Sequence, residues 1–269
     1  MKLNPSLLSQ HLDYLKLPFL QQHHAERAQQ SAQQHWDHVE YLHRLIEGEY
    51  TERRQRVLER RVKAARFPVL KTREQFRWDW PRGITTACRR RGRSGPIPRG
   101  WPKKINRLQV QNLFRLEFVA QKANVGLLGN VGLGKTHLAI ALGYAACQEG
   151  YAVRFADAIR VINDLSAAQK RGLLKRQLKK YLAPELLLLD ELGYLPIDQH
   201  GADLLFQVIS QRYERGSIVL TTNQPFKQWA SLFNHDSTIA SAVLDRLLHH
   251  AETVVIEGSS YRMKEQVTP

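Results

Sequence analysis

The sequence predicts an α/β protein built on a doubly wound parallel sheet, with a small helical domain at its N-terminus. Three observations predict this fold. Strand-like and helix-like segments alternate from residue 124 onward, the order that gives a parallel sheet with helices on both faces. The run Leu186–Leu189 is continuously apolar, as in strands that are buried on both sides. The first 66 residues instead place apolar residues at helical spacing.

Residues 1–66 are predicted to form a helical domain that contacts DNA or a protein partner. One apolar stripe lies in "LLSQHLDYL", and a second covers residues 36–46 and is expected to stop at Gly48. Thr51 is expected to cap a third helix that ends before "FP". That helix contains "ERRQRVLERRVKAAR", which is either a surface for DNA or a partner, or an ordinary solvated face.

Residues 67–102 are predicted to be a linker between this domain and an α/β domain over residues 103–269. The stretch "WPRGITTACRRRGRSGPIPRGWP" holds six arginines and no acidic residue, and Trp-Pro stands at both of its ends. Glycine, proline and like charges disfavour a packed core, so a mobile loop is expected here. Its arginines either raise non-specific DNA affinity or are inert.

The α/β domain is expected to alternate helices and strands in a regular order. Strands are predicted over residues 124–129, 151–157, 185–192, 217–223 and 252–258. Helices are predicted over residues 103–122, 135–150, 158–182, 202–216 and 238–251.

The strongest single motif is "GNVGLGKT", between the first strand of this domain and the helix after it. It fits G-x-x-x-x-G-K-[ST], whose backbone N–H groups and helix N-terminus hold phosphates. Lys135 is expected to reach the β- and γ-phosphates of ATP, and Thr136 to bind Mg²⁺. A chance match in a glycine turn is the alternative. The predicted nucleotide-binding residues are Gly129, Asn130, Val131, Gly132, Leu133, Gly134, Lys135 and Thr136.

Polar residues are also predicted at the carboxyl ends of two other strands. Asp190 is expected to hold the Mg²⁺ through water, and Glu191 to orient and polarise the attacking water. The alternative is a pair of solvated carboxylates at a strand end. Asn223 is expected at the same edge, where it holds the water or the γ-phosphate, unless it simply caps a loop.

A late helix contains "LDRLLHH". Arg246 on its apolar background suggests action in trans on a neighbour's γ-phosphate, and an ion pair with Asp245 or Glu252 is the alternative. His249 and His250 are interpreted as cations at a helix end or as solvated imidazoles. The sequence places no third ligand beside them at a metal-binding spacing, so no zinc site is predicted.

The segment "KRGLLKRQLKK" contains six basic residues and no acid. It is a candidate to bind the phosphate backbone of DNA, or else a solvated helix face. The predicted DNA contacts are Lys170, Arg171, Lys175, Arg176, Lys179 and Lys180.

Composition favours a polyanionic partner and a reducing compartment. The net charge is +15 and the pI is about 10.0. Cys88 and Cys147 make no disulfide framework and no metal-ligand spacing. Apolar runs are too short to span a bilayer, so a soluble, cytoplasmic protein without membrane contact is expected.

The order of "GNVGLGKTHLA", "LLLLDELGYLP", "RYERGSIVLTTNQPFKQW" and "LDRLLHHAETVVIEGSSYR" resembles the IstB family. These are helper ATPases of insertion-sequence transposition, related to DnaC helicase loaders within the AAA+ class. The resemblance covers residues 103–269 and extends upstream. It implies a homo-oligomer that assembles with ATP on double-stranded DNA, DNA-stimulated hydrolysis, and a separate DDE-type transposase as partner. It also suggests Arg262 in "SYRMK" as a second nucleotide-sensing arginine.

The resemblance indicates that residues 82–102 are an insertion, because family members run from the linker directly into the helix before the glycine loop. Two other functions stay open at this point. One is a DnaC-like replicative helicase loader. The other is a DNA scaffold that binds ATP but hardly hydrolyses it.

Overall fold

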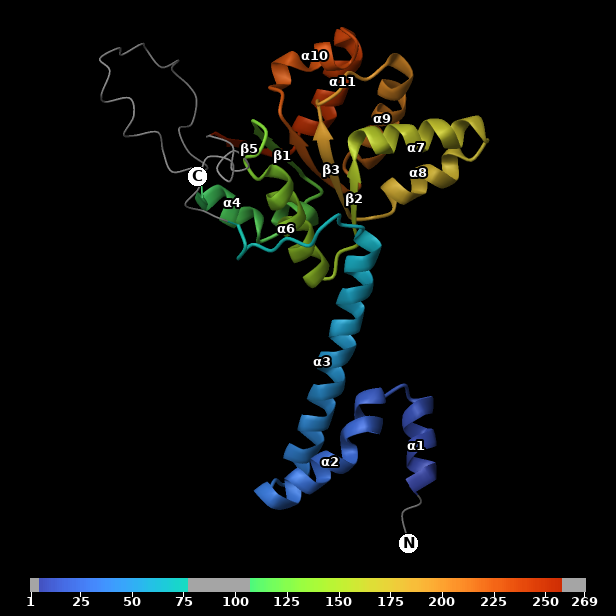
Figure 1. Ribbon diagram of the computed structural model, residues 1–269, viewed down its shortest axis with the longest axis vertical. Helices are drawn as coiled ribbons and strands as arrows, with labels where there is room; N and C mark the ends of the chain where they lie inside the picture. Colours follow the sequence, from blue (N-terminus) through green and yellow to red (C-terminus); the bar gives the residue numbers. More distant parts are fainter. Residues whose placement is uncertain (1–4, 77–106, 258–269) are drawn as a thin grey trace, which may run out of the picture. The chain divides into compact units, whose positions relative to one another are not determined.

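The computed structural model describes residues 5–76 and 107–257, which belong to two units, Met1–Arg60 and Arg61–Pro269 (Figure 1). Residues 61–76, which were predicted to end the helical domain and begin the linker, have their contacts with the second unit. The predicted insertion at 82–102 and Arg262 lie outside the described residues.

The second unit is built on a five-stranded sheet with the order β2-β3-β4-β1-β5. Every neighbouring pair in it is parallel, which confirms the predicted doubly wound sheet. The strands are β1 (Asn124–Gly129), β2 (Val153–Asp157), β3 (Leu186–Leu192), β4 (Ser217–Thr222) and β5 (Ala251–Ile256).

Helices cover both faces of this sheet (Figure 1). One face is covered by α6 (Lys135–Gln148), the other by α7 (Ala158–Lys170), α9 (Gln199–Arg212) and α11 (Ser237–Leu248). Alternate side chains of β3 serve the two layers. Leu187 and Leu189 lie in the core formed with α7 and α9, whereas Leu188 packs on Gly143 of α6. The remaining helices are α4 (Arg107–Leu113), α5 (Glu117–Ala120), α8 (Leu174–Leu182), η1 (Phe226–Gln228) and α10 (Trp229–Leu232).

Two helices predicted as continuous are each broken. The predicted helix over 158–182 divides into α7 and α8, because Gly172 between them adopts a left-handed φ of 70°. The predicted helix over 103–122 divides into α4 and α5 at Leu116, whose φ is 60°. Neither break interrupts the apolar pattern, so periodicity alone does not reveal it.

The first unit contains α1 (Pro5–Tyr14), α2 (Pro18–Gln34) and most of α3 (His38–Ala65). The predicted stop at Gly48 and restart at Thr51 are wrong, because α3 runs through both. Gly48 makes room for a ring, because a Cβ there would overlap the side chain of Phe19.

The apolar stripe predicted over residues 36–46 is only partly buried. Leu45 packs with Leu12 and Leu20 in the small core of this unit, whereas Val39, Leu42 and Ile46 are exposed.

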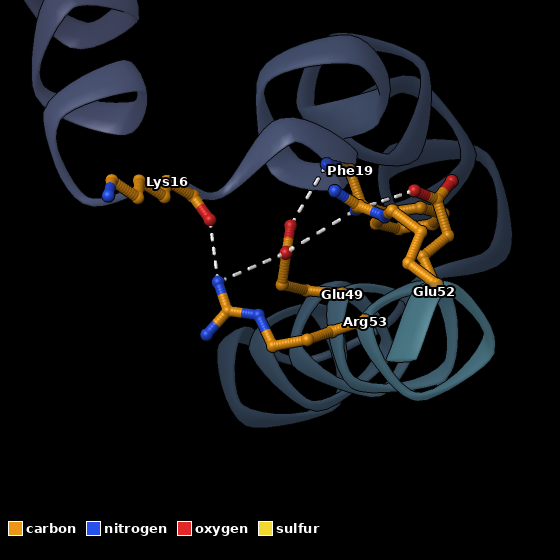
Figure 2. A network of polar contacts seen from close by, with 6 residues as sticks. Lys16, Phe19, Glu49, Glu52 and Arg53 are labelled. Carbon is orange, nitrogen blue, oxygen red and sulfur yellow. Dashed lines mark hydrogen bonds and ion pairs between the residues drawn. The ribbon is translucent and has the colours of Figure 1, made fainter. Parts of the chain in front are cut away.

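A buried carboxylate holds the first unit together (Figure 2). Glu49 on α3 is 4 % exposed and accepts the backbone N–H of Phe19 at 2.9 Å, in the first turn of α2. It thereby does the work of a cap at a helix start where Leu17 offers no side-chain acceptor. Arg53 on the same helix donates to the carbonyl of Lys16 at 2.6 Å, which fixes the turn between α1 and α2.

In the described part of the chain, no helix is long and apolar enough to cross a membrane.

Candidate nucleotide-binding site

The glycine loop leaves the carboxyl end of β1 and leads directly into α6. Gly132 and Gly134 have φ values of 79° and 84°, a conformation that side-chain-bearing residues rarely adopt. Gly134 is the N-cap of α6, and it supplies no side-chain cap for the first N–H groups of the helix. These N–H groups, together with the helix dipole, form a site that suits a phosphate.

Lys135 and Thr136 begin α6 at the centre of this site. Lys135 is 5 % exposed, and its Nζ donates to the carbonyl oxygens of Gly129 at 2.7 Å and of Asn130 at 2.8 Å. The ammonium group is therefore held across the loop. Thr136 Oγ1 donates to Asp190 Oδ1 at 3.0 Å, which joins the loop to β3.

Asp190 is buried at the carboxyl end of β3, with 6 % of its surface exposed. Burial raises the pKa of its carboxyl group, while hydrogen bonds from Thr221 and Thr136 and the charge of Lys135 oppose this shift. Thr221 Oγ1 lies 2.5 Å from Asp190 Oδ1 and accepts the backbone N–H of Glu191 at 3.0 Å. A buried carboxylate beside two hydroxyl groups is a donor set that suits Mg²⁺.

Sequence reasoning missed Thr221. Its only signal was a hydroxyl residue in "VLTTN", and its role depends on strand order. Because β4 lies between β1 and β3, Thr221 stands between the glycine loop and the acidic strand end.

Glu191 leaves the regular strand geometry just where its function is predicted. Its φ is +60°, uncommon for a residue other than glycine, and the pairing register of β3 with β4 shifts between Leu189 and Leu192. The side chain is exposed and lines the same cavity as Lys135 and Thr136. Local strain of this kind at a strand end is common where a side chain must be aimed.

Asn223 directly follows β4 at the same edge of the sheet. Its Oδ1 atom is buried and has no hydrogen-bond partner among the described residues. A buried acceptor left unpaired costs about 1–3 kcal/mol. The position therefore has an unused acceptor beside the acidic strand end.

The cavity at this edge measures about 660 Å³ and extends beyond the phosphate loop. Its other wall is the segment 68–76, which sequence analysis treated as linker. Val69 and Leu70 line it together with Ile140 of α6, so this end of the cavity is apolar. It suits a flat aromatic base. The local sequence "FPVL" is apolar, but nothing in it showed that the segment packs beside the glycine loop.

His137 fastens this segment to α6. Its Nε2 lies 3.1 Å from the carbonyl oxygen of Thr72, and burial lowers the pKa of its imidazole. The neutral ring therefore donates Nε2–H to Thr72. Phe76 packs edge-on against His137, with ring centroids 5.3 Å apart, and its Cε2 would lie 2.9 Å from a Cβ on Gly134.

Arg246 lies at the other end of the strands, beside their amino ends, which we call the amino edge of the sheet. Its Nη1 donates to Ala242 O at 3.0 Å, and its Cζ lies 4.8 Å from the ring centroid of Phe206. No carboxylate of the described residues is within ion-pair distance of it, so the predicted alternative of a pair with Asp245 or Glu252 is not observed.

The start of β1 marks this edge. The Asn124 amide at that point donates to the carbonyl of Leu247 at 3.1 Å. The length of β1, about 16 Å, therefore separates the end of α11 from the glycine loop. Within one chain, Arg246 and Thr136 are not brought together.

The six predicted DNA-binding cations are all exposed, at the end of α7, in the turn that follows and on α8. On α8, Leu178 and Tyr181 are buried against the core, which leaves the lysines and arginine outward. Arg212 holds the end of α8 by donating to the carbonyls of Tyr181 at 2.7 Å and Pro184 at 2.8 Å. Burial lowers the pKa of Arg212 to about 10, so it is charged at neutral pH.

The family model for IstB-like ATP binding proteins matches residues 10–88 and 101–268. This chain belongs to the IstB-like family. The match leaves out residues 89–100, which lie within the segment predicted to be an insertion.

Three relatives that match most of this chain are proteins of insertion sequences. The ATP-binding protein of IS21 from Pseudomonas aeruginosa is 39 % identical, over 95 % of this chain and 88 % of its own length. That of IS232 from Bacillus thuringiensis subsp. berliner is 36 % identical, over 98 % and 97 %. That of IS5376 from Geobacillus stearothermophilus is 34 % identical, over 94 % and 92 %.

A solved structure supports the α/β fold of the second unit. The crystal structure of DnaI superimposes with a TM-score of 0.50 and 19 % identity, over 56 % of this chain and 85 % of DnaI. The DnaC helicase loader has a TM-score of 0.49 and 25 % identity, over 59 % of this chain and 94 % of that one.

Proposed function

We propose that this IstB-like protein is an ATPase that assembles on double-stranded DNA and assists a separate DDE-type transposase in moving an insertion sequence. The observation that carries the proposal is one cavity that brings together the glycine loop, the Thr136–Asp190 hydrogen bond and Glu191. The relatives' names, ATP-binding proteins of insertion sequences, support the choice of nucleotide and of biological setting.

The residues divide the work of binding and hydrolysis. The N–H groups of the loop and the Lys135 ammonium bind the phosphates, and the apolar wall of Val69, Leu70 and Ile140 receives the adenine. Thr136 and Asp190 hold Mg²⁺, which neutralises phosphate charge when bound. Glu191 orients the attacking water as its general base.

Asn223 supports this water. Its buried Oδ1 needs a donor, and a water bound beside the acidic strand end supplies one.

Arg246 completes the site from a second subunit. It lies the length of β1 away from its own loop, and its guanidinium has no carboxylate partner among the described residues. An arginine placed this way can reach a γ-phosphate only across an interface, which makes assembly a condition for hydrolysis. Arg262 is proposed as a further nucleotide-sensing arginine.

The exposed cations of α7 and α8 supply the DNA surface. They contribute six of the positive charges behind the net charge of +15. Contacts of this kind bind phosphates without reading bases. We place the protein in the cytoplasm, where Cys147 stays a buried, free thiol.

The test is ATP hydrolysis with and without duplex DNA. Wild-type protein should show DNA-stimulated turnover, and Glu191→Gln should bind ATP yet lose turnover. Glu149→Gln removes an exposed carboxylate beyond the end of α6 and should behave as wild type. If wild type turns ATP over no faster than Glu191→Gln, the protein is an ATP-binding scaffold and the ATPase proposal is wrong.

A further inference from the structure

A second group of metal-ligating side chains lies far from the nucleotide cavity, at the amino edge of the sheet. In the described part of the chain, Glu214, His249 and His250 each offer one ligand atom, and these atoms lie within 4.8 Å of one another. The histidines directly follow α11, whose C-cap is His249, whereas Glu214 comes from the turn between α9 and β4. The fold therefore adds a third ligand to the histidine pair, from 35 residues upstream in the sequence.

We propose that Glu214, His249 and His250 bind a divalent transition-metal ion of the zinc class. Two imidazoles and a carboxylate are a donor set that zinc uses with a fourth position left open. Ligand atoms on one tetrahedral zinc ion are about 3.4 Å apart, so side-chain rotations that shorten the 4.8 Å spread by roughly 1.4 Å are needed.

The carboxylate and the imidazoles are near one another without being paired. Ion pairs between histidine and glutamate occur elsewhere in the chain, for example His23 with Glu26 at 3.5 Å. Among the described residues, Glu214 makes no such pair with His249 or His250 within 4.0 Å. The three ligand atoms are therefore close together without a direct ion pair among them.

Tyr213 orients one of the ligands. Its hydroxyl oxygen lies 2.7 Å from His249 Nδ1. When Nδ1–H donates to this oxygen, the neutral ring directs Nε2 outward as the metal-binding atom. A histidine that binds a metal usually donates its other N–H to a carboxylate, a backbone carbonyl or water, and the tyrosine hydroxyl would take that place here. This contact is the observation that distinguishes the group from three polar side chains meeting by chance.

The backbone under the three ligands is held in place. Asn124 N–H donates to His250 O at 2.7 Å, and His249 N–H donates to Asp245 O at 3.0 Å. Glu214 has a φ of 56°, in a turn closed by the bond from Arg215 N–H to Arg212 O at 2.9 Å. The ligands therefore approach the ion from two fixed segments, and only their side chains need to move.

The position of the site gives it a consequence that rests on the proposed function. His249 is three residues after Arg246. If Arg246 faces a neighbouring subunit's phosphates, a bound ion lies close to that same surface. Metal binding itself does not depend on that arrangement.

The experiment uses full-length, untagged protein stripped with EDTA and titrated with Co²⁺ without nucleotide, followed by the visible absorption of bound cobalt. Wild type should bind one Co²⁺ per chain that Zn²⁺ displaces, with an increase in melting temperature. His249→Ala/His250→Ala should lose this absorption. The matched control, His23→Ala/His24→Ala, removes another adjacent histidine pair and should retain it.

Two further variants keep the outcome interpretable if the double variant folds poorly. Glu214→Gln preserves the shape of an exposed side chain and should abolish four-coordinate cobalt absorption without changing the metal-free melting temperature. Tyr213→Phe should weaken binding by about 10- to 100-fold. Absence of binding by wild type, or equal binding by His249→Ala/His250→Ala and the control, would overturn the proposal. Because no step uses ATP, failure here leaves the proposed ATPase untouched.

Discussion

The two edges of the parallel sheet are built for different tasks. At the carboxyl edge, the glycine loop, Asp190 and Glu191 form a nearly complete site, joined by Thr136 and Thr221. At the amino edge, Arg246 rests on Phe206 and donates only to a backbone carbonyl of its own helix. One edge carries the proposed nucleotide site, whereas the other presents an arginine with no carboxylate partner among the described residues.

From this difference we infer that nucleotide binding and the proposed hydrolysis have separate structural requirements. In the proposed function, the carboxyl edge supplies the groups that hold the phosphates and a metal ion, so a single subunit should bind nucleotide. The amino edge supplies a positive charge that β1 keeps away from its own phosphates. We therefore propose that hydrolysis needs the carboxyl edge of one subunit to meet the amino edge of another.

The largest effect is expected from removing Lys135. Lys135→Ala takes away the ammonium group held across the loop by Gly129 and Asn130, and ATP affinity should fall by about 100-fold or more. Equilibrium binding of a fluorescent ATP analogue measures this. Lys63→Ala removes an exposed lysine and should bind normally. Unchanged affinity of Lys135→Ala would show that the loop does not hold the phosphates.

Arg246→Ala should separate the two edges. ATP binding should stay within a few-fold of wild type, while DNA-stimulated hydrolysis should fall by about 1,000-fold. The control is Arg215→Ala, which removes an exposed arginine from the turn just before β4 and should keep its turnover. Loss of ATP binding in Arg246→Ala would instead place this arginine in the site of its own chain.

The pH dependence should distinguish the edges too. Because burial raises the pKa of Asp190, the Mg²⁺ concentration needed for half-maximal hydrolysis should rise as pH falls, beginning above the range of an ordinary aspartate. Thr221→Val removes a hydrogen bond that favours the carboxylate, so this range should move to higher pH, about tenfold in Mg²⁺ for each unit of pKa. If Thr221→Val leaves the pH profile of the Mg²⁺ requirement unchanged, Asp190 does not bind the metal ion.

The raised pKa of Asp190 also affects the free energy of unfolding of the metal-free protein, with the opposite dependence on pH. A raised carboxyl pKa means that the folded chain holds this proton more tightly than the unfolded chain. The contribution of Asp190 to the free energy of unfolding is therefore present at low pH and is lost as pH rises through the raised pKa. Saturating Mg²⁺ should remove this loss, and denaturant titrations with and without Mg²⁺ at several pH values measure it.

The smallest effect is expected from the exposed cations of α8, which are separate from the reactive groups at both edges of the sheet. Lys179→Ala/Lys180→Ala should lower DNA affinity uniformly across sequences and reduce the salt dependence of binding by about one to two ions. ATP affinity should not change. Lys122→Ala/Arg215→Ala removes the same charge elsewhere and tests whether location matters. Equal losses in both variants would assign the effect to net charge alone.

Local pattern was sufficient for much of this protein. The predicted strand over 124–129 has the bounds of β1. The glycine loop follows β1, the acidic pair lies at the end of β3, and Asn223 follows β4, as expected. Each depends on residues adjacent in the sequence. The wrong stop at Gly48 has the opposite cause, because the ring that fills its space comes from Phe19 on another helix.

What the sequence could not reveal depends on strand order and on contacts between distant segments. Thr221 gains its role because β4 separates β1 from β3. The segment 68–76 becomes a cavity wall through His137 and Thr72. Glu214 meets the histidine pair only after α9 and α11 pack side by side.

The most direct measurement of the two-edge account mixes two variants that are each inactive. Glu191→Gln binds ATP and offers an intact Arg246, while Arg246→Ala binds ATP and retains Glu191. Random assembly on duplex DNA should place the intact halves together at about a quarter of interfaces, restoring about a quarter of wild-type hydrolysis at equal mixing. Hydrolysis that stays at the level of either variant alone would contradict a site completed between subunits.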